Sequence, residues 1–376
     1  MTNPLRELEA LGQSVWLDDI DRGQLRSGLF AQLIEEDGLS GATGNPTIFE
    51  HAIDHGTAYD EQMRQLIAEG KAAQAIYETL AMADERTVAD LLRPIYERTG
   101  GQDGFVSIEV SPYLAHDTER TLFEVRRFWQ AIDRPNLMVK IPSTPAGIPA
   151  IRRALAEGIN INITLIFSLE NYRQVAEAYL SALEERLAAG RDISRIASVA
   201  SFFVSRVDTL VDRLLEEQIK AAGTGTRQQH LKDLQGKAAI ANARLAYQEF
   251  KRLFSGPRFA ALQQHGAHVQ RPLWASTSAK NPAYRDVLYV EELLGSDTVN
   301  TMPLKTLESF REHGRVRLSI VDQLAEAKAE LAALAEAGIS YDEVTRQLQE
   351  EGVEKFIDSF QTLFACIEKK RQALVP

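Results

Sequence analysis

The sequence is short of cysteine, of long apolar runs and of net positive charge. Its 376 residues include one cysteine, Cys366, so an internal disulfide is excluded, and a reducing compartment fits this usage. No run approaches the roughly 18 apolar residues that a membrane-spanning helix needs, so we expect no membrane partner. The formal net charge is −11, which disfavours a nucleic-acid partner because phosphate backbones attract basic surfaces. These features favour a cytoplasmic protein.

Short apolar or alternating runs recur along the chain, and each is followed by a helical pattern. Strands that alternate with helices predict parallel βαβ units, and eight such units favour a closed (β/α)8 TIM barrel over an open sheet. No strand pattern remains after Met302, so we interpret residues 305–376 as additional helices packed on the barrel. No segment resembles a flexible linker, and we expect a single domain over residues 1–376, with the barrel strands at about 14–302. The candidate strands are 14–18, 38–43, 105–110, 137–141, 161–166, 196–203, 271–276 and 298–302.

One candidate strand carries a polar face. Asn160, Asn162 and Thr164 alternate with isoleucine and leucine, so the polar side chains share one face and the apolar ones the other. If helices cover the sheet, the polar face points to the barrel axis. There the two amides and the hydroxyl need partners, which a bound polar ligand would supply. The alternative is a sheet with one face in water.

Three other candidate strands place a charged residue near the carboxyl end. Asp18 shares a face with Trp16, which favours it over the adjacent Asp19, and Glu109 and Lys140 end two further runs. Each one alone is most simply a strand-end residue that reaches solvent. Together they indicate a site, because barrel enzymes build their active sites at the carboxyl ends of the strands.

Lys140 lies inside an apolar run, where an ammonium group is costly and tends to lose its proton. A neutral amine attacks carbonyl groups and forms a Schiff base, and Glu109 and Asp18 could carry the protons. These residue types on one barrel rim suggest aldol chemistry on a polyhydroxy carbonyl compound. The alternative, which the residues leave open, is an ion pair of Lys140 with Glu or Asp that holds the strands in register.

Six motifs follow one another in a fixed order along the chain. Each alone is weakly specific, but the ordered set, which spans most of residues 14–305, is strongly specific. Its motifs are GATGNPTIFEHAI (41–53), VSIEVSP (106–112), LMVKIPST (137–144), NINITLIFS (160–168), VASFFVSRVD (199–208) and WASTSAKNP (274–282). With them the chain resembles the transaldolase family, in its longer bacterial form.

The resemblance implies a TIM-barrel transferase of the non-oxidative pentose phosphate pathway, with sugar-phosphate substrates and no cofactor. Such an enzyme moves a dihydroxyacetone unit from sedoheptulose 7-phosphate or fructose 6-phosphate to glyceraldehyde 3-phosphate or erythrose 4-phosphate. Two alternatives are a Schiff-base fructose 6-phosphate aldolase that releases free dihydroxyacetone, and a non-catalytic sugar-phosphate binder. Both a monomer and a homodimer are open. We also expect no metal site, because neither histidine pair, His51 with His55 or His265 with His268, has a Cys or Glu at metal-binding spacing.

The resemblance also implies a role for each matched residue. Lys140 would form the Schiff base, Asp18 would act as acid and base at the cleaved bond, and Glu109 would work with Thr164 through a water molecule. The residues expected to bind substrate are Asn45, Asn162 and Ser201 for hydroxyl groups, and Arg206 for phosphate.

One position departs from the family pattern. Shorter members have an arginine where this chain has Lys280, and a lysine is a point charge that cannot make a forked contact with phosphate. The second phosphate contact is therefore open among Lys280, Ser276 and Ser278, of which we expect Lys280 and Ser278 to take part.

Overall fold

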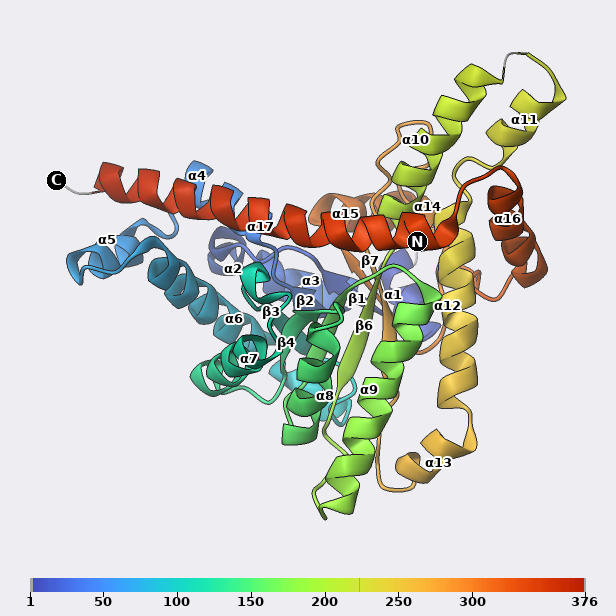
Figure 1. The fold of residues 1–376 in the computed structure, drawn as a ribbon. Coiled ribbons are helices and arrows are strands. Elements are labelled where there is room, and N and C mark those ends of the chain that lie inside the picture. Colours follow the sequence, from blue (N-terminus) through green and yellow to red (C-terminus); the bar gives the residue numbers. More distant parts are fainter. Residues whose placement is uncertain (1–2, 223, 375–376) are drawn as a thin grey trace.

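The backbone forms a closed barrel of parallel strands, in which each strand pairs with its neighbours in sequence and β8 closes on β1 (Figure 1). The structure is a computed structural model that describes residues 3–222 and 224–374. The predicted TIM-barrel class is confirmed. The strands are β1 (Gln13–Leu17), β2 (Leu39–Thr43), β3 (Phe105–Glu109), β4 (Leu137–Pro142), β5 (Ile161–Ile166), β6 (Ser198–Phe203), β7 (Arg271–Ala275) and β8 (Thr298–Met302).

Helices cover the outside of the barrel and one of its ends. They are α1 (Pro4–Ala10), α2 (Arg22–Ser27), α3 (Leu29–Asp37), α4 (Pro46–His55), α5 (Asp60–Ala68), α6 (Ala73–Arg98), η1 (Pro112–Leu114), α7 (Thr118–Ile132), α8 (Gly147–Glu157), α9 (Leu169–Ala188), α10 (Ser205–Ala221), α11 (Thr226–Asp233), α12 (Ala238–Phe254), α13 (Pro257–Gln263), α14 (Leu288–Glu292), α15 (Leu304–His313), α16 (Leu324–Glu336) and α17 (Tyr341–Leu374).

All eight predicted strands are present, and their ends lie close to the predicted ones. The largest difference is in β6, which begins at Ser198 rather than at 196. β1 ends at Leu17, so Asp18 lies just beyond the strand. The region 305–376, predicted as additional helices, differs in part: α15 packs on β8 and α1 as the last helix of the barrel wall.

The polar face of β5 points into the barrel. Asn162 donates a hydrogen bond to Ser107 Oγ at 3.0 Å and accepts one from Ser201 Oγ at 2.6 Å. Since Ser107 is on β3 and β4 lies between β3 and β5, this bond crosses the barrel interior. Ile161 and Ile163 are fully buried in the apolar core, as the alternation predicted.

The amino-terminal end of the barrel is filled by side chains. A Cβ atom on Gly41 would lie 2.3 Å from the ring of Trp16, so glycine there gives the indole room to lie across the interior. The indole Nε1 donates to Asp103 at 2.9 Å, and Arg271 bridges Asp103, at 3.3 Å, and Ser14, at 2.6 Å. These contacts tie β1 and β7 to the loop before β3 at this end of the barrel.

The long helix α17 runs across the barrel, and its carboxyl-terminal half continues over α4 and α5 (Figure 1). It approaches the barrel closely, because a Cβ atom on Gly352 would lie 2.8 Å from Leu165 of β5. Further along, Phe360 contacts Tyr77 of α6 edge to face, with ring centroids 5.5 Å apart. Cys366 is 8% exposed and belongs to the same apolar cluster.

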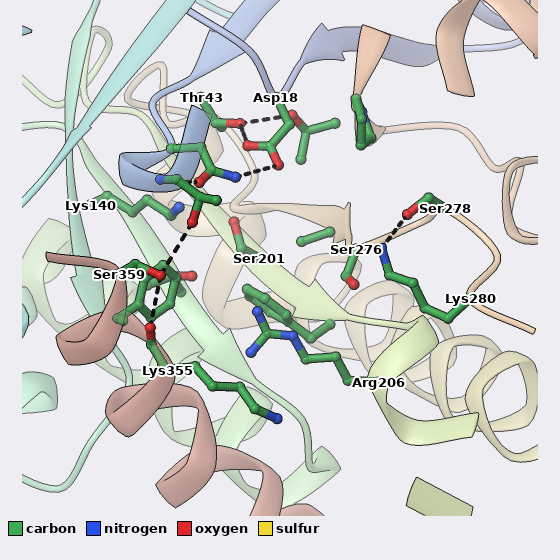
Figure 2. A pocket seen from close by; sticks show the side chains of 18 residues that line it. Asp18, Thr43, Lys140, Ser201, Arg206, Ser276, Ser278, Lys280, Lys355 and Ser359 are labelled. Atoms are coloured by element: carbon green, nitrogen blue, oxygen red, sulfur yellow. Dashed lines mark hydrogen bonds between the residues drawn. The ribbon is translucent and has the colours of Figure 1, made fainter. Parts of the chain in front are cut away.

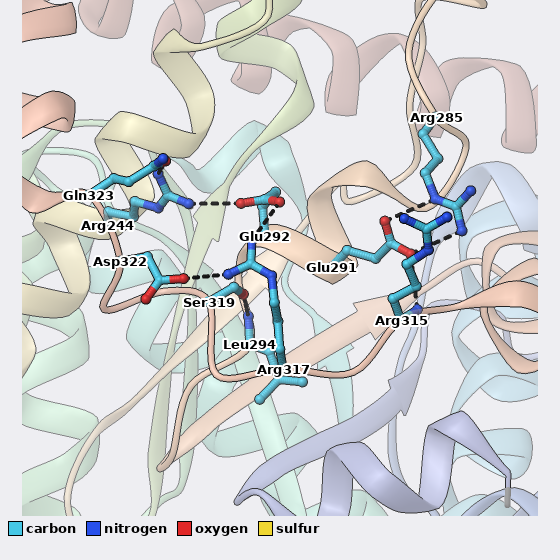
Figure 3. Close-up of polar contacts among 10 residues, drawn as sticks. All are labelled: Arg244, Arg285, Glu291, Glu292, Leu294, Arg315, Arg317, Ser319, Asp322 and Gln323. Atoms are coloured by element: carbon cyan, nitrogen blue, oxygen red, sulfur yellow. Dashed lines mark hydrogen bonds and ion pairs between the residues drawn. The ribbon is translucent and has the colours of Figure 1, made fainter.

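The segment between α15 and α16 is held by ion pairs (Figure 3). Arg317 bonds to Glu292 of α14 at 2.9 Å and to Asp322 within the segment. Arg244 of α12 reaches the same Glu292 at 2.7 Å. Single exposed ion pairs contribute about 0–1 kcal/mol, but a shared carboxylate couples these contacts and fixes the path of the chain towards α16.

Among the described residues, no helix has both the length and the apolar character required to cross a membrane.

Candidate active site

A cavity of about 230 Å³ opens at the carboxyl ends of the strands, where α17 forms part of its wall (Figure 2). We call it the mouth cavity. Eight of the ten predicted site residues line it, and Glu109 and Asn162 lie directly beside it. The lining residues are Asp18, Thr43, Asn45, Thr47, Lys140, Thr164, Ser201, Phe203, Arg206, Ala275, Ser276, Ser278, Lys280, Thr301, Pro303, Lys355, Phe356 and Ser359.

Lys140 and Glu109 occupy directly paired positions on β4 and β3. Lys140 Nζ lies 3.5 Å from Glu109 Oε2, and both residues are 7% exposed. Burial raises the pKa of Glu109, and attraction to the Lys140 ammonium opposes this rise. The ion pair that the sequence left open is therefore present, but it borders a cavity. A carboxylate so placed can take the proton that the amine must lose before it attacks a carbonyl group.

Asp18 directly follows β1 and lines the same cavity as Lys140. Its carboxylate accepts hydrogen bonds from Thr43 Oγ1 at 2.6 Å and from Asn45 Nδ2 at 3.4 Å. Asn45 is the N-cap of α4, where its oxygen also accepts from the backbone of Thr47. Asp19 does not line the cavity and accepts a bond from Gln24 of α2 instead. The structure thus brings Asp18, and not its neighbour, to the site.

Thr164 and Ser201 supply hydroxyl groups to the cavity wall. Thr164 is fully buried, and its Oγ1 has no hydrogen-bond partner among the described residues. Ser201 donates to Asn162, which is fully buried and pairs with Val199, two residues before Ser201 on β6. Asn162 therefore holds the Ser201 side chain at the cavity wall.

Two cationic side chains approach the cavity, one from the helix after β6 and one from the loop after β7. Arg206 lies in the first turn of α10 with its guanidinium 5.0 Å from the centroid of the Phe203 ring. Its Nη1 is buried and has no hydrogen-bond partner in the part of the chain that the structure describes. Lys280 Nζ donates to Ser278 Oγ at 2.8 Å. The pKa of Lys280 is lowered by partial burial and then by the nearby charge of Arg206. Two neighbouring cations at a cavity favour an anionic ligand.

The second serine of this loop faces the cavity as well. Ser276 shares a hydrogen bond of 2.9 Å with Ser205, and its backbone has a φ of 57°. That left-handed conformation is uncommon outside glycine and turns the chain at the end of β7.

Sequence reasoning missed several lining residues. Thr43 bonds to Asp18 and also to Thr301 at 2.9 Å. Thr43 and Thr301 occupy strand positions whose side chains point into the barrel. Polar–apolar alternation does not single them out, because Thr43 shares its parity with Leu39 and Thr301 shares its parity with Val299.

Four further lining residues were missed as well: Thr47, Phe203, Ala275 and Pro303. Three more missed residues come from α17, where nothing in the sequence signals proximity to β4: Lys355, Phe356 and Ser359. The ring centroid of Phe356 lies 5.5 Å from Lys140 Nζ.

No group of three or more His, Cys, Asp or Glu side chains within residues 3–222 and 224–374 is arranged to hold a metal ion. The hydroxyl groups, amides, carboxylates and cations of the mouth cavity match a polyhydroxylated, anionic ligand. The buried amine among them can attack a carbonyl carbon of that ligand.

Comparisons with known proteins agree with this chemistry. The sequence model of the family "Transaldolase/Fructose-6-phosphate aldolase" matches residues 15–367. A transaldolase of Thermobifida fusca is 50% identical over 374 residues, which cover 99% of this chain and 100% of the relative. "Transaldolase 1" of Streptomyces avermitilis is 50% identical over 95% of this chain and 93% of its own, and a Trichodesmium erythraeum transaldolase is 45% identical over the full length of both. The chain belongs to the transaldolase/fructose-6-phosphate aldolase family.

Proposed function

We propose that this chain is a transaldolase. It transfers a dihydroxyacetone unit from sedoheptulose 7-phosphate or fructose 6-phosphate to glyceraldehyde 3-phosphate or erythrose 4-phosphate, in the non-oxidative pentose phosphate pathway. The observation that carries this proposal is the buried Lys140 amine, which borders the mouth cavity beside Glu109 and shares that cavity with Asp18. Relatives named transaldolase, which this chain matches over 93% and 100% of their lengths, support the transferase reading.

The first stage is imine formation. The neutral amine of Lys140 attacks the C2 carbonyl carbon of the ketose, and Glu109 holds the proton that the ammonium gave up. The carbinolamine then loses its C2 hydroxyl group as water. Glu109 supplies the proton for that step through a water molecule, which Thr164 can hold because its Oγ1 has no other partner among the described residues.

The second stage is carbon–carbon cleavage. Asp18 takes the proton of the C4 hydroxyl group, the C3–C4 bond breaks, and its electron pair moves into the imine to give an enamine on Lys140. An aldose phosphate leaves. The enamine carbon then attacks the aldehyde of the acceptor, and Asp18 returns the proton to the new hydroxyl group. Water finally attacks the imine and releases the product from the Lys140 amine.

The remaining residues position the sugar. We assign Asn45 and Ser201 to the hydroxyl groups of the dihydroxyacetone unit, and Asn162 acts beside them through its bond to Ser201. Arg206 binds the phosphate, with Lys280 and Ser278 as the second contact. Because α17 supplies Phe356 to the cavity wall, we propose that the barrel and α17 form one domain. We also propose that the protein works in the cytoplasm.

A single assay tests this function. Sedoheptulose 7-phosphate with glyceraldehyde 3-phosphate should give erythrose 4-phosphate, and turnover should require the aldehyde acceptor. Release of free dihydroxyacetone from fructose 6-phosphate alone, at a comparable rate, would assign the aldolase activity instead. Binding without turnover and without a borohydride-trapped adduct would leave only a sugar-phosphate binder.

The phosphate assignment leads to a selective loss of affinity. Arg206→Ala should lower kcat/KM for fructose 6-phosphate by about two orders of magnitude, because each charge-assisted hydrogen bond contributes roughly 1.5–3 kcal/mol. Lys280→Ala should show a smaller loss, since a lysine makes a single contact.

Unphosphorylated fructose is the control substrate, because it never makes this contact. Its poor turnover should barely change in either variant. Equal losses of kcat/KM on fructose and on fructose 6-phosphate would mean that Arg206 supports the fold rather than the phosphate.

A further inference from the structure

A second buried carboxyl group lies behind Glu109. Glu85 of α6 is 4% exposed, and its Oε2 has no hydrogen-bond partner among the described residues. A Cβ atom added to Gly44 would lie 2.8 Å from Glu85 Oε1. The carboxyl group of Glu85 therefore lies beside the loop that carries Asn45. No step of the proposed reaction uses Glu85, and leaving such a group buried and unpaired is costly.

Glu85 and Glu109 line the same small cavity, distinct from the mouth cavity. Its volume is about 20 Å³, and a cavity of roughly 10–15 Å³ is enough to hold one water molecule. Asp84 and Asn45 add polar groups to it, and the rest of the wall is mostly apolar. The full lining is Ile20, Gly44, Asn45, Pro46, Phe49, Tyr77, Ala81, Asp84, Glu85, Ile108 and Glu109.

Two buried carboxylate oxygens of residues that line this small cavity have no hydrogen-bond partner among the described residues. Arg22 Nε donates to Asp84 Oδ1 at 2.7 Å, but Asp84 Oδ2 is buried without a partner among the described residues, as Glu85 Oε2 is. One water molecule can accept a bond from one carboxyl group and donate to two others. In the small cavity such a water molecule would give Glu85 Oε2 a partner, and Asp84 and Glu109 line the same cavity as its further acceptors. Buried water commonly makes about three such bonds.

We propose that Glu85 is a positioning residue for Glu109: its carboxyl group donates a hydrogen bond, through one water molecule in the small cavity, to the carboxylate of Glu109. This inference rests on the proposed function, because it concerns the group that carries protons for Lys140. It assigns Glu85 no contact with the substrate.

The charges around Glu85 suit the role of a donor. Burial, and then repulsion from Asp84, raise the pKa of Glu85 well above its ordinary value, and attraction to Lys140 opposes them only in part. These effects favour the protonated form of Glu85, which can donate a hydrogen bond. The charged and titratable groups that act on Glu85 or Glu109 are Asp84, Lys140, Asp18 and Arg206, with Tyr77 beside both carboxyl groups.

The donated bond has a defined effect on Glu109. Burial raises the pKa of Glu109, whereas a hydrogen bond to its ionised form lowers it. With the bond, Glu109 stays ionised to lower pH and is ready to take the proton of Lys140. Without it, the acidic limb of the pH profile of kcat/KM should move to higher pH.

The test compares two variants of Glu85. Glu85→Met keeps the length of the side chain but has no hydrogen-bond donor. It should move the acidic limb to higher pH by about one unit, so that kcat/KM at pH values below the limb falls about tenfold. Glu85→Gln keeps a donor and the shape, and it should leave the limb in place and kcat within about threefold.

Two further variants test whether the water molecule in the small cavity causes the shift. Ala81→Val fills the small cavity while leaving Glu85 in place, so it should displace the water molecule and repeat the shift of Glu85→Met. Glu124→Gln is the matched control, because Glu124 is a buried carboxyl group that already accepts from the backbone of Ser111 and from Arg127 and does not line the small cavity. It should not move the limb.

The proposal is overturned if Glu85→Met and Ala81→Val leave the limb where it is in wild type, or if Glu85→Gln moves it as far as Glu85→Met does. A readout without turnover separates this inference from the proposed function. In a 13C-carboxyl NMR titration of the resting protein, the resonance assigned to Glu109 through Glu109→Gln should titrate at higher pH in Glu85→Met. An unchanged titration would also overturn the proposal, whether or not wild type proves active as a transaldolase.

Discussion

Lys140→Ala is expected to lose its borohydride-trapped adduct and nearly all turnover. In wild type, borohydride added with fructose 6-phosphate should reduce the enamine-derived imine and fix a three-carbon unit on Lys140. Without the amine no imine forms, and removal of a covalent nucleophile typically costs at least about 10⁴-fold in rate. Peptide mass mapping of the trapped protein locates the adduct, and a coupled assay of erythrose 4-phosphate gives the rate.

The fold should survive this change. Lys140 contributes one ion pair at 3.5 Å, and Glu109, left without its cation, can bind a proton because burial already raises its pKa. Thermal unfolding of the variant should therefore remain cooperative. Lys251→Ala is the matched control, since Lys251 is exposed and lies outside the mouth cavity, and it should keep the adduct. An adduct on any lysine other than Lys140 would refute the assignment.

The barrel was predictable from the sequence because its signal is local. Alternation of Asn162 and Thr164 with isoleucines marks a strand with one polar face, and the pairing of Glu109 with Lys140 follows once β3 and β4 lie side by side. Parity also separated Asp18 from Asp19, and the structure brings only Asp18 to the mouth cavity. Ends of parallel strands meet at one edge, so residues far apart in sequence could be grouped without coordinates.

The part of the site that comes from α17 was not predictable in this way. Its helical pattern shows that it packs somewhere, but not that Phe356 packs over Lys140, more than 200 positions away in sequence (356 − 140 = 216). The close approach depends on Gly352 against Leu165, a contact between two elements that no periodicity connects. The sequence analysis also missed Glu85, because a glutamate on a helix is ordinarily exposed to solvent.

Asp18→Ala should stop carbon–carbon cleavage while still allowing the imine to form. The C4 hydroxyl proton would have no acceptor, and loss of a general base typically costs 10²–10⁴-fold in rate, so we expect kcat to fall by about that amount. Lys140 and Glu109 remain in place, so the ketose should still be bound covalently. Borohydride added with fructose 6-phosphate should then trap the intact six-carbon sugar phosphate on Lys140, where wild type traps the three-carbon unit.

Asp19→Asn is the control for this experiment, because it changes the adjacent residue without reaching the cavity. Burial raises the pKa of Asp19 from 3.8 to about 6, so its ionised form is less stable in the folded protein than in the unfolded chain. Above pH 6 that difference disfavours folding, and replacing the carboxylate by a neutral amide should not lower the melting temperature at pH 7.5. Its kcat should stay close to wild type, since its bond to Gln24 points it away from the substrate. If Asp19→Asn stops cleavage and Asp18→Ala does not, the general base is Asp19, and the side chains after β1 face the opposite way in the working enzyme.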